Sequence, residues 1–392
     1  MQSLTQSPTA ARFVQNPYPF YERARALGPF FHWTDYDLPC TTSHTAINAI
    51  LRDRRFGREC PPALRPAVPE HLRPFYAVED HSMLELEPPH HTRLRGLVLR
   101  AFTSRRIATL APEIEAIAHQ LIDALPEGEC DLIAHFCRRL PMLVIARLIG
   151  IPEPLAPEVE RWSSAIVGMY QAGRSRQTEE RAAAAAAVFA EFLRLYIGAR
   201  RRRPADDLLT HLIQAEAEGE RLSTDEVIAT CILILNAGHE AAVHAIGNAV
   251  KTLLETETPP EALSPPQIGA TVEELLRYDP PLHLFKRYVY ADAEIMGQSF
   301  RAGSEVALLL AAANRDPGAW HQPQRFLPAR PEKAHLSFSA GLHFCLGAPL
   351  ARLEMAAALP VLFARRPGLR LIGKPRYANT YHFRGLERLM VT

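Results

Sequence analysis

Four long segments with apolar residues at helical spacing restrict this chain to a mostly helical fold. They cover residues 111–125, 131–150, 181–203 and 223–255. The last segment begins at Ser223 and has Glu226 three residues later, which is the capping box that marks the start of a helix. Pro204 follows the third segment and marks its end. The sequence therefore predicts a core that is built mainly by helices.

Strand-like patterns are fewer and lie in the last third of the chain. Residues 287–296 and 305–313 flank the turn-rich stretch 297–304, and the final residues alternate enough for short strands. Two proline-rich stretches, 60–74 and 317–331, predict long irregular loops. The chain shows neither an internal repeat nor a clear linker. We expect one mainly α domain, residues 1–392, with a minor β-sheet region.

Composition narrows the class of protein and its location. Hydrophobic residues make up 47% and charged residues 22%, as in globular proteins, and the net charge of +1 does not suggest a nucleic-acid binder. The six cysteines form no Cys-x-x-Cys pair, which fits a reducing compartment. The N-terminus lacks the apolar core of a signal peptide, and no apolar run approaches the ~20 residues that span a bilayer. The sequence predicts a cytoplasmic protein without a membrane anchor.

One cysteine stands out by its surroundings. Cys345 lies in FSAGLHFCLGAPLAR, residues 338–352, with glycines on both sides and a helical pattern behind it. The thiol has four possible roles: a buried structural cysteine, a zinc ligand, a catalytic nucleophile, or an axial ligand of haem iron. Only His335 and His343 are near it in the sequence, which is a poor zinc set.

The local sequence favours the haem ligand. Gly341 and Gly347 allow backbone angles that other residues avoid and let a flat partner approach the main chain. The helix that follows places a thiolate at the positive end of a helix dipole, near free amide groups. Both effects are expected to lower the pKa of the thiol.

The stretch resembles the cysteine loop of the cytochrome P-450 family, Phe-Gly-x-Gly-x-His-x-Cys-x-Gly. The matching residues are Phe338, Gly341, His343, Cys345 and Gly347. Ser339 departs from the usual glycine, which is expected to alter the hairpin slightly. The resemblance implies the cytochrome P-450 fold, with haem b between a long central helix and the cysteine-loop helix. It also implies that Cys345 is the metal ligand.

Two further groups of residues resemble family motifs. Glu274 and Arg277 match Glu-x-x-Arg and lie one helical turn apart. By resemblance, Arg325 of the proline-rich loop joins them in a buried network that braces the cysteine loop. The second group is expected to bind the haem propionates: His91, Arg95, Arg287 and His343.

The longest predicted helix carries a match and a mismatch. Ala237, Gly238 and Glu240 resemble the family's Ala-Gly-x-acid-Thr, which passes over the iron and leaves room for dioxygen. Position 241 is Ala241 instead of threonine, so the usual acid–alcohol pair lacks its hydroxyl. Proton delivery then depends on Glu240, a solvent chain or a substrate hydroxyl, unless the alanine was engineered. His239 and His244 are expected to be helix-face residues, with a histidine relay as the alternative.

The resemblance implies a monooxygenase that inserts one oxygen atom of dioxygen into a small, largely apolar substrate. Electrons are expected from a separate ferredoxin or flavodoxin and its NAD(P)H-dependent reductase, because the chain has no Gly-x-Gly-x-x-Gly nucleotide motif. Ala241 leaves two alternatives open: a peroxide-driven or dehydratase-like haem enzyme, and a haem protein that binds a ligand without turnover. By resemblance, the substrate pocket is lined by Met83, Leu84, Leu282, His283 and Phe383, with Tyr381 close by.

Overall fold

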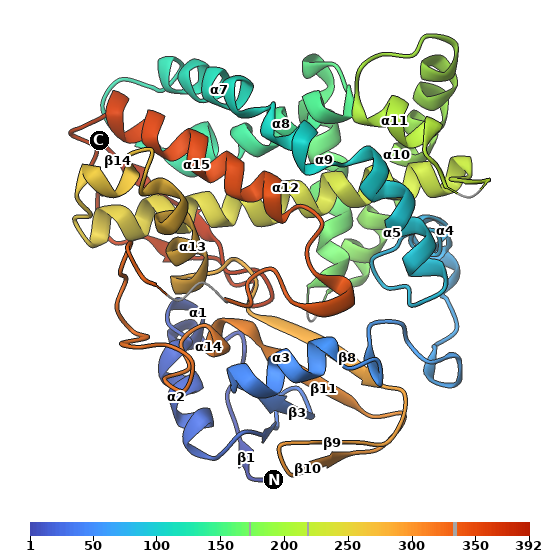
Figure 1. The fold of residues 1–392 in the computed structure, drawn as a ribbon, viewed down its shortest axis with the longest axis vertical. Helices are drawn as coiled ribbons and strands as arrows, with labels where there is room; N and C mark the ends of the chain where they lie inside the picture. Colours follow the sequence, from blue (N-terminus) through green and yellow to red (C-terminus); the bar gives the residue numbers. More distant parts are fainter. Residues whose placement is uncertain (172–173, 218, 332–334) are drawn as a thin grey trace.

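The chain folds into a large helical part and a smaller part built around a sheet. The computed structural model describes residues 1–171, 174–217, 219–331 and 335–392. Figure 1 shows the sheet and the N-terminus at one end, and the long helices with the C-terminus at the other. The mainly helical fold with a minor sheet, predicted from the sequence, is confirmed.

Most of the chain forms helices of very different lengths. In chain order they are α1 (Ala11–Gln15), α2 (Tyr18–Ala26), α3 (His44–Arg52), α4 (Arg73–Glu79), α5 (His90–Ala101), α6 (Ser104–Ala108), α7 (Ala111–Asp123), α8 (Arg139–Ile149), α9 (Ala156–Val167), α10 (Arg176–Arg202), α11 (Leu208–Gln214), α12 (Thr224–Glu255), α13 (Ile268–Tyr278), α14 (Leu310–Ala313) and α15 (Ala348–Arg365).

The strands are short. They are β1 (Ser3–Leu4), β2 (Phe31–Trp33), β3 (Leu38–Thr41), β4 (Phe56–Gly57), β5 (Cys130–Asp131), β6 (Glu216–Ala217), β7 (Glu220–Arg221), β8 (Leu284–Val289), β9 (Ala293–Ile295), β10 (Gln298–Phe300), β11 (Glu305–Leu309), β12 (Arg376–Tyr377), β13 (Leu386–Arg388) and β14 (Met390–Val391). The main sheet has the order β1-β2-β3-β11-β8-β4, and the described residues also form the two-stranded sheets β9-β10, β12-β13, β5-β14 and β6-β7.

The main sheet is covered on both faces. Along β11, Val306 and Leu308 pack into an apolar cluster with α3, whereas Ala307 and Leu309 pack into an aromatic cluster with α1 and α2. Alternate residues of a strand point to opposite faces, so an uninterrupted apolar strand of this kind belongs in the middle of a covered sheet. The sheet thereby fixes β8, which contributes to the site described below.

The long helix α12 runs through the helical part (Figure 1). Ser223 caps it, and Glu226 completes the predicted capping box. The expectation that no segment is apolar enough to span a bilayer is wrong by length and composition, because α10 and α12 both pass that test. In α12, 67% of the most apolar window is buried inside the protein, which is typical of a core helix.

Candidate functional site

The loop before α15 has a left-handed backbone at two positions. Gly341 has φ +67°, and a Cβ at this position would lie 2.2 Å from the carbonyl oxygen of Leu51, so a glycine is required. Ser339 has φ +63°. The serine that replaces the expected glycine therefore adopts the glycine-like conformation itself, at a cost of roughly 1–2 kcal/mol. The amide of Cys345 donates to the carbonyl oxygen of Phe338 at 2.9 Å and closes the loop.

The thiol of Cys345 differs from most of the other thiols. Four of the six cysteines are buried, while Cys345 and Cys60 are partly exposed. Burial raises the pKa of the Cys345 thiol, and the backbone N–H groups of Gly347 and Ala348 offset only part of this effect. The predicted lowering by the amides of the helix start is therefore present, but desolvation of the thiolate is larger and raises the pKa overall.

This environment argues against one of the roles considered for the cysteine. It does not exclude a structural role, because the residue is only partly exposed and its thiol is desolvated. Among the described residues, no group of three or more His, Cys, Asp or Glu side chains could hold a metal ion, which excludes a zinc site there. The nearby His343 hydrogen-bonds to Glu87 through Nε2 at 2.9 Å.

The four residues expected to bind propionates come from three parts of the chain that meet beside the cysteine loop. His91 and Arg95 lie on α5, Arg287 on β8 and His343 just before the cysteine. The rings of His91 and His343 are 4.4 Å apart between centroids. Arg95 Nη2 donates to the carbonyl oxygen of Phe344 at 2.7 Å, so α5 is tied directly to the cysteine loop.

These basic side chains lie close enough to lower one another's pKa, and one of their nitrogen atoms has no hydrogen-bond partner. Burial, followed by the charges of His343 and Arg95, lowers the pKa of His91 to about 4. Burial and the nearby Arg58 lower the pKa of Arg287 to about 9. His91 Nδ1 is buried and has no hydrogen-bond partner. A set of buried and partly buried donors of this kind fits a group that carries two carboxylates, because anions would relieve the crowding of positive charge.

One face of α12 is less buried than the rest of the helix. Leu233 and Ala241 are partly exposed and Ala237 is exposed, although their neighbours in the helix are mostly buried. The spacing of four residues places the three on one side of the helix. A flat apolar group fits against small side chains of this kind.

Gly238 packs closely against α8, and its expected role near the iron stays a prediction. A Cβ at this glycine would lie 3.3 Å from Cδ1 of Ile145 on α8. The glycine therefore serves the packing of α12 against α8, and does not lie on the exposed alanine face. A rotation of about 100° per residue separates neighbouring positions of a helix, so Gly238 and Ala237 face different directions.

Glu240 is paired with a histidine. Its Oε1 lies 3.2 Å from Nε2 of His244, one turn further along α12. His239 is fully buried on another face, and its Nε2 lies 3.3 Å from the carbonyl oxygen of Arg138. His244 lies on a face of α12 with its partner one turn away, as expected of a helix-face residue, whereas His239 is buried.

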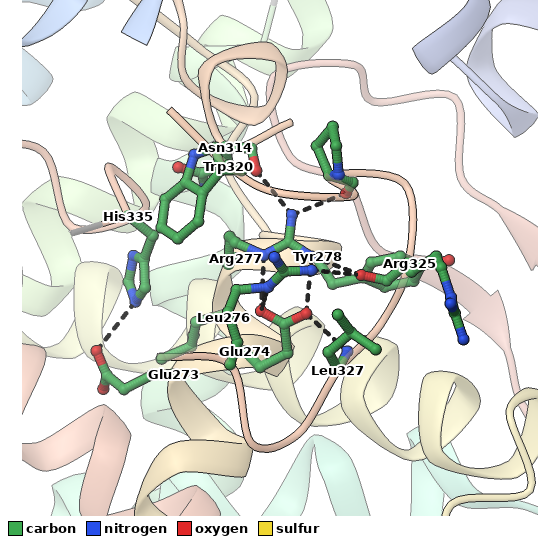
Figure 2. A network of polar contacts seen from close by, with 12 residues as sticks. Glu273, Glu274, Leu276, Arg277, Tyr278, Asn314, Trp320, Arg325, Leu327 and His335 are labelled. Atoms are coloured by element: carbon green, nitrogen blue, oxygen red, sulfur yellow. Dashed lines mark hydrogen bonds and ion pairs between the residues drawn. The ribbon is translucent and has the colours of Figure 1, made fainter. Parts of the chain in front are cut away.

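The Glu274–Arg277 pair is buried and fully engaged. Both side chains are 1% exposed, and two parallel hydrogen bonds of 2.7 and 2.8 Å join them (Figure 2). Arg277 also donates to the carbonyl oxygens of Asn314, Pro323 and Arg325. The pair thus holds the irregular loop before the cysteine in place, and an unpaired buried charge would be costly.

The third member of this network is Arg330, and the prediction of Arg325 is wrong. Arg330 Nε donates to Glu274 Oε2 at 2.9 Å, and this side chain is 2% exposed. Arg325 is exposed and its side chain bonds to Gln322, while only its carbonyl oxygen accepts from the network. Both arginines belong to the same proline-rich loop, and the path of that loop turns Arg330, and not Arg325, toward Glu274.

A second network, centred on Glu273, lies next to this one and was not predicted from the sequence. Glu273 accepts hydrogen bonds from Arg352 Nε at 2.5 Å and Nη2 at 3.0 Å, and lies 3.3 Å from His335 Nε2. The guanidinium of Arg352 also lies over the ring of Phe338, 4.5 Å from its centroid. The carboxylate thus connects α13 to both sides of the cysteine loop, and Figure 2 shows its contact with His335. Its place beside Glu274 was the only signal in the sequence.

The predicted pocket residues separate into two groups. Leu84, Leu282 and Phe383 are partly exposed, and Leu282 pairs with Phe383 through an isolated bridge. Met83 is buried in the large helical core. His283 is fully buried, and its Nδ1 lies 2.8 Å from the hydroxyl of Tyr21, which also bonds Tyr381. The prediction that His283 lines a pocket is wrong, because its ring joins the aromatic cluster under the sheet.

Comparisons with known proteins agree with one another. The family model described as Cytochrome P450 matches residues 266–365. The chain is 34% identical to the "Biotin biosynthesis cytochrome P450" of Bacillus subtilis, with 100% of this chain and 99% of the relative covered. It is 34% identical to the "Cytochrome P450 monooxygenase PikC" of Streptomyces venezuelae, with 97% and 91% covered. The crystal structure of P450BioI with a fatty-acyl-ligated acyl carrier protein is similar, with a TM-score of 0.91, 35% identity, and 97% and 99% covered.

Proposed function

The chain belongs to the cytochrome P450 family of haem-thiolate monooxygenases, and we propose that Cys345 is the residue through which it holds the iron. The observation that carries this assignment is the partly exposed thiol at the start of α15, in a loop that requires Gly341. The amides of Gly347 and Ala348 lie close enough to the sulfur to stabilise its charge.

The haem, when bound, supplies the redox chemistry that inserts one oxygen atom of dioxygen into the substrate. Its carboxylates would be bound by His91, Arg95, Arg287 and His343. The chain has no Cys-x-x-Cys-His run that would attach the cofactor covalently, so we assign haem b. Ala237 and Ala241 would lie over the flat face, where small side chains leave space.

The test of the ligand compares two cysteines with similar exposure. Cys345→Ser is expected to abolish the thiolate absorption band of the ferrous carbon monoxide adduct. Cys60→Ser, at the other partly exposed cysteine, is expected to keep it. A Cys345→Ser protein that retains the band would refute the assignment, and a wild-type protein without the band would refute haem-thiolate chemistry altogether.

We assign electron delivery to a ferredoxin or flavodoxin with an NAD(P)H-dependent reductase, and the site of action to the cytoplasm. Support comes from the absence of a dinucleotide motif in the sequence, and from bacterial relatives that match nearly the full length of the chain. Under carbon monoxide, NADPH with a reductase and ferredoxin should generate the thiolate band. Omission of the reductase and the ferredoxin should prevent formation of this band. Product formation from peroxide alone would instead support the peroxide-driven alternative.

The substrate is assigned only by class. Leu84, Leu282 and Phe383 offer apolar, partly exposed surface, which suits a small and largely apolar organic molecule. Binding of such molecules beside a bound haem should shift its Soret band. A panel in which only charged, strongly polar compounds shift the band would contradict this class.

A further inference from the structure

A carboxylate and an imidazole form a pair directly beside the exposed alanine face of α12. Glu240 is three residues after Ala237, and His244 is three residues after Ala241, so each lies next to one alanine on the helix surface. Glu240 Oε1 and His244 Nε2 are 3.2 Å apart. The pair thus occupies the place beside position 241, where the family's hydroxyl is missing.

The imidazole ring of His244 packs closely against the backbone of the C-terminal turn. A Cβ on Gly385 would lie 1.8 Å from Nδ1 of His244, so the ring lies directly against the backbone of the C-terminal turn. The ring of Phe383 lies 6.0 Å from the imidazole on the same turn. The absence of a side chain at Gly385 is therefore what makes room for His244. A histidine that was merely solvated on a helix face would not need this space.

The charges around the pair favour its ionised carboxylate. Burial pushes the pKa of Glu240 upward, but the hydrogen bond and charge of His244 outweigh this effect and hold that pKa below its ordinary value. Smaller contributions come from His239 on α12 and from Arg138, while Glu160 of α9 acts in the opposite sense. The C-terminal turn contacts the ring with the apolar Phe383 and with backbone.

The pair also retains access to solvent. The side chain of Glu240 is 23% exposed, and that of His244 is 12% exposed. Both side chains are thus more exposed than that of Glu274, which is 1% exposed in its pair with Arg277. A partly exposed acid–base pair exchanges protons with water, whereas a fully buried ion pair has no path for them.

We propose that Glu240 and His244 act together as the proton-delivery unit of this enzyme, with His244 holding Glu240 beside Ala241. The inference rests on the proposed function. In each transfer, the imidazolium gives its Nε2 proton to the carboxylate, which passes it to water beside Ala241. The imidazole then takes a new proton from solvent. The unit returns to its starting charge, and the electrons come from the redox carrier.

The pairing itself is tested without turnover. In the ferrous carbon monoxide form, carbon-13 NMR of labelled glutamate carboxyls follows the ionisation of Glu240, whose signal is identified by its loss in Glu240→Gln. The pKa of Glu240 is expected to rise in His244→Gln, because its main stabilising partner is gone. His211→Gln is the matched control. His211 lies on α11, and its Nε2 is 3.1 Å from Oδ1 of Asp206, which precedes that helix. An unchanged pKa in His244→Gln would overturn the pairing.

Proton delivery is tested by the fate of dioxygen without substrate. With NADPH, ferredoxin and reductase, one NADPH per dioxygen yields peroxide, and two NADPH yield two waters. Formation of water requires further protons at the bond that breaks, so His244→Gln and Glu240→Gln are expected to raise the peroxide share severalfold. His211→Gln should leave it unchanged. An unchanged share in His244→Gln, or a wild type that forms only peroxide, would overturn the proposal.

Two further variants separate proton exchange from simple anchoring. His244→Lys keeps a cation beside Glu240 but does not exchange its proton as readily near neutral pH. It is expected to leave the peroxide share high, and full rescue would reduce His244 to an anchor and refute proton sharing. Gly385→Ala is expected to displace the ring and raise the peroxide share. A wild type without the thiolate band, or without NADPH consumption, would instead contradict the proposed function.

Discussion

Glu354 provides a sharp test of the electrostatics of the core. This side chain lies on α15, is 1% exposed, and has one carboxyl oxygen with no hydrogen-bond partner. Burial raises its pKa to about 8. The carboxyl is therefore neutral at neutral pH in the folded protein, whereas it is ionised in the unfolded chain. Replacement by glutamine keeps the shape and removes the titration.

The magnitude and sign follow from proton linkage. The folded state holds a proton that the unfolded state releases near its ordinary pKa of about 4.3. The free energy of unfolding of the wild type therefore falls as pH rises, by about 1.4 kcal/mol per pH unit, until the folded protein also ionises near pH 8. The stabilisation that the protonated Glu354 contributes is fully present below the pKa of this group in the unfolded chain. Between about pH 5 and 8, Glu354→Gln should gain about 4 kcal/mol relative to the wild type.

The assay is urea unfolding of the holoenzyme at several pH values, with linear extrapolation to water. The difference between Glu354→Gln and the wild type should increase steadily with pH and level off above about pH 8. Glu115→Gln, at an exposed glutamate of α7, is the control and should stay parallel to the wild type. Parallel curves for Glu354→Gln as well would show that the carboxyl has a polar partner, and would refute the reasoning.

Four substitutions test the loop and its support by the same unfolding assay. Gly341→Ala should lower the free energy of unfolding by about 2 kcal/mol or more and weaken the thiolate band, because the added Cβ meets Leu51 and φ is positive; a neutral effect would contradict this backbone. Ser339→Gly should raise stability by about 1 kcal/mol, because glycine relieves the left-handed strain; a loss would show that the buried hydroxyl has a partner. Arg330→Gln should cost about 3–5 kcal/mol and Arg325→Gln less than about 0.5 kcal/mol, and the reverse order would restore the original expectation.

The parts of the site that depend on local spacing could be predicted from the sequence. The loop around Cys345 is closed by backbone bonds over a few residues and is followed at once by a helix. The pair Glu274–Arg277 is likewise separated by one helical turn. In both cases the sequence distance fixes the spatial distance, because a helix or a tight turn leaves the chain little freedom.

The parts that depend on the path of irregular chain could not be predicted. Arg325 and Arg330 lie in a loop without helix or strand, so no periodicity indicates which side chain turns inward. Strands β1 to β4 are two to four residues long, too short for an alternating pattern, and β3 pairs with the distant β11. The fit of His244 against Gly385 joins two segments far apart in the chain, and no spacing rule reaches that far.

Three carboxyl groups in the core show how the choice of partner decides what a buried acid can do. Glu274 accepts hydrogen bonds from two arginines, whose charge is permanent, and braces a loop. Glu354 has only apolar burial to set its pKa, so it stays neutral. Glu240 is paired with a histidine, the side chain that ordinarily changes charge between about pH 5 and 8. Of the three, only Glu240 is paired with a histidine, and it is the one that lies beside the alanine where the hydroxyl is missing.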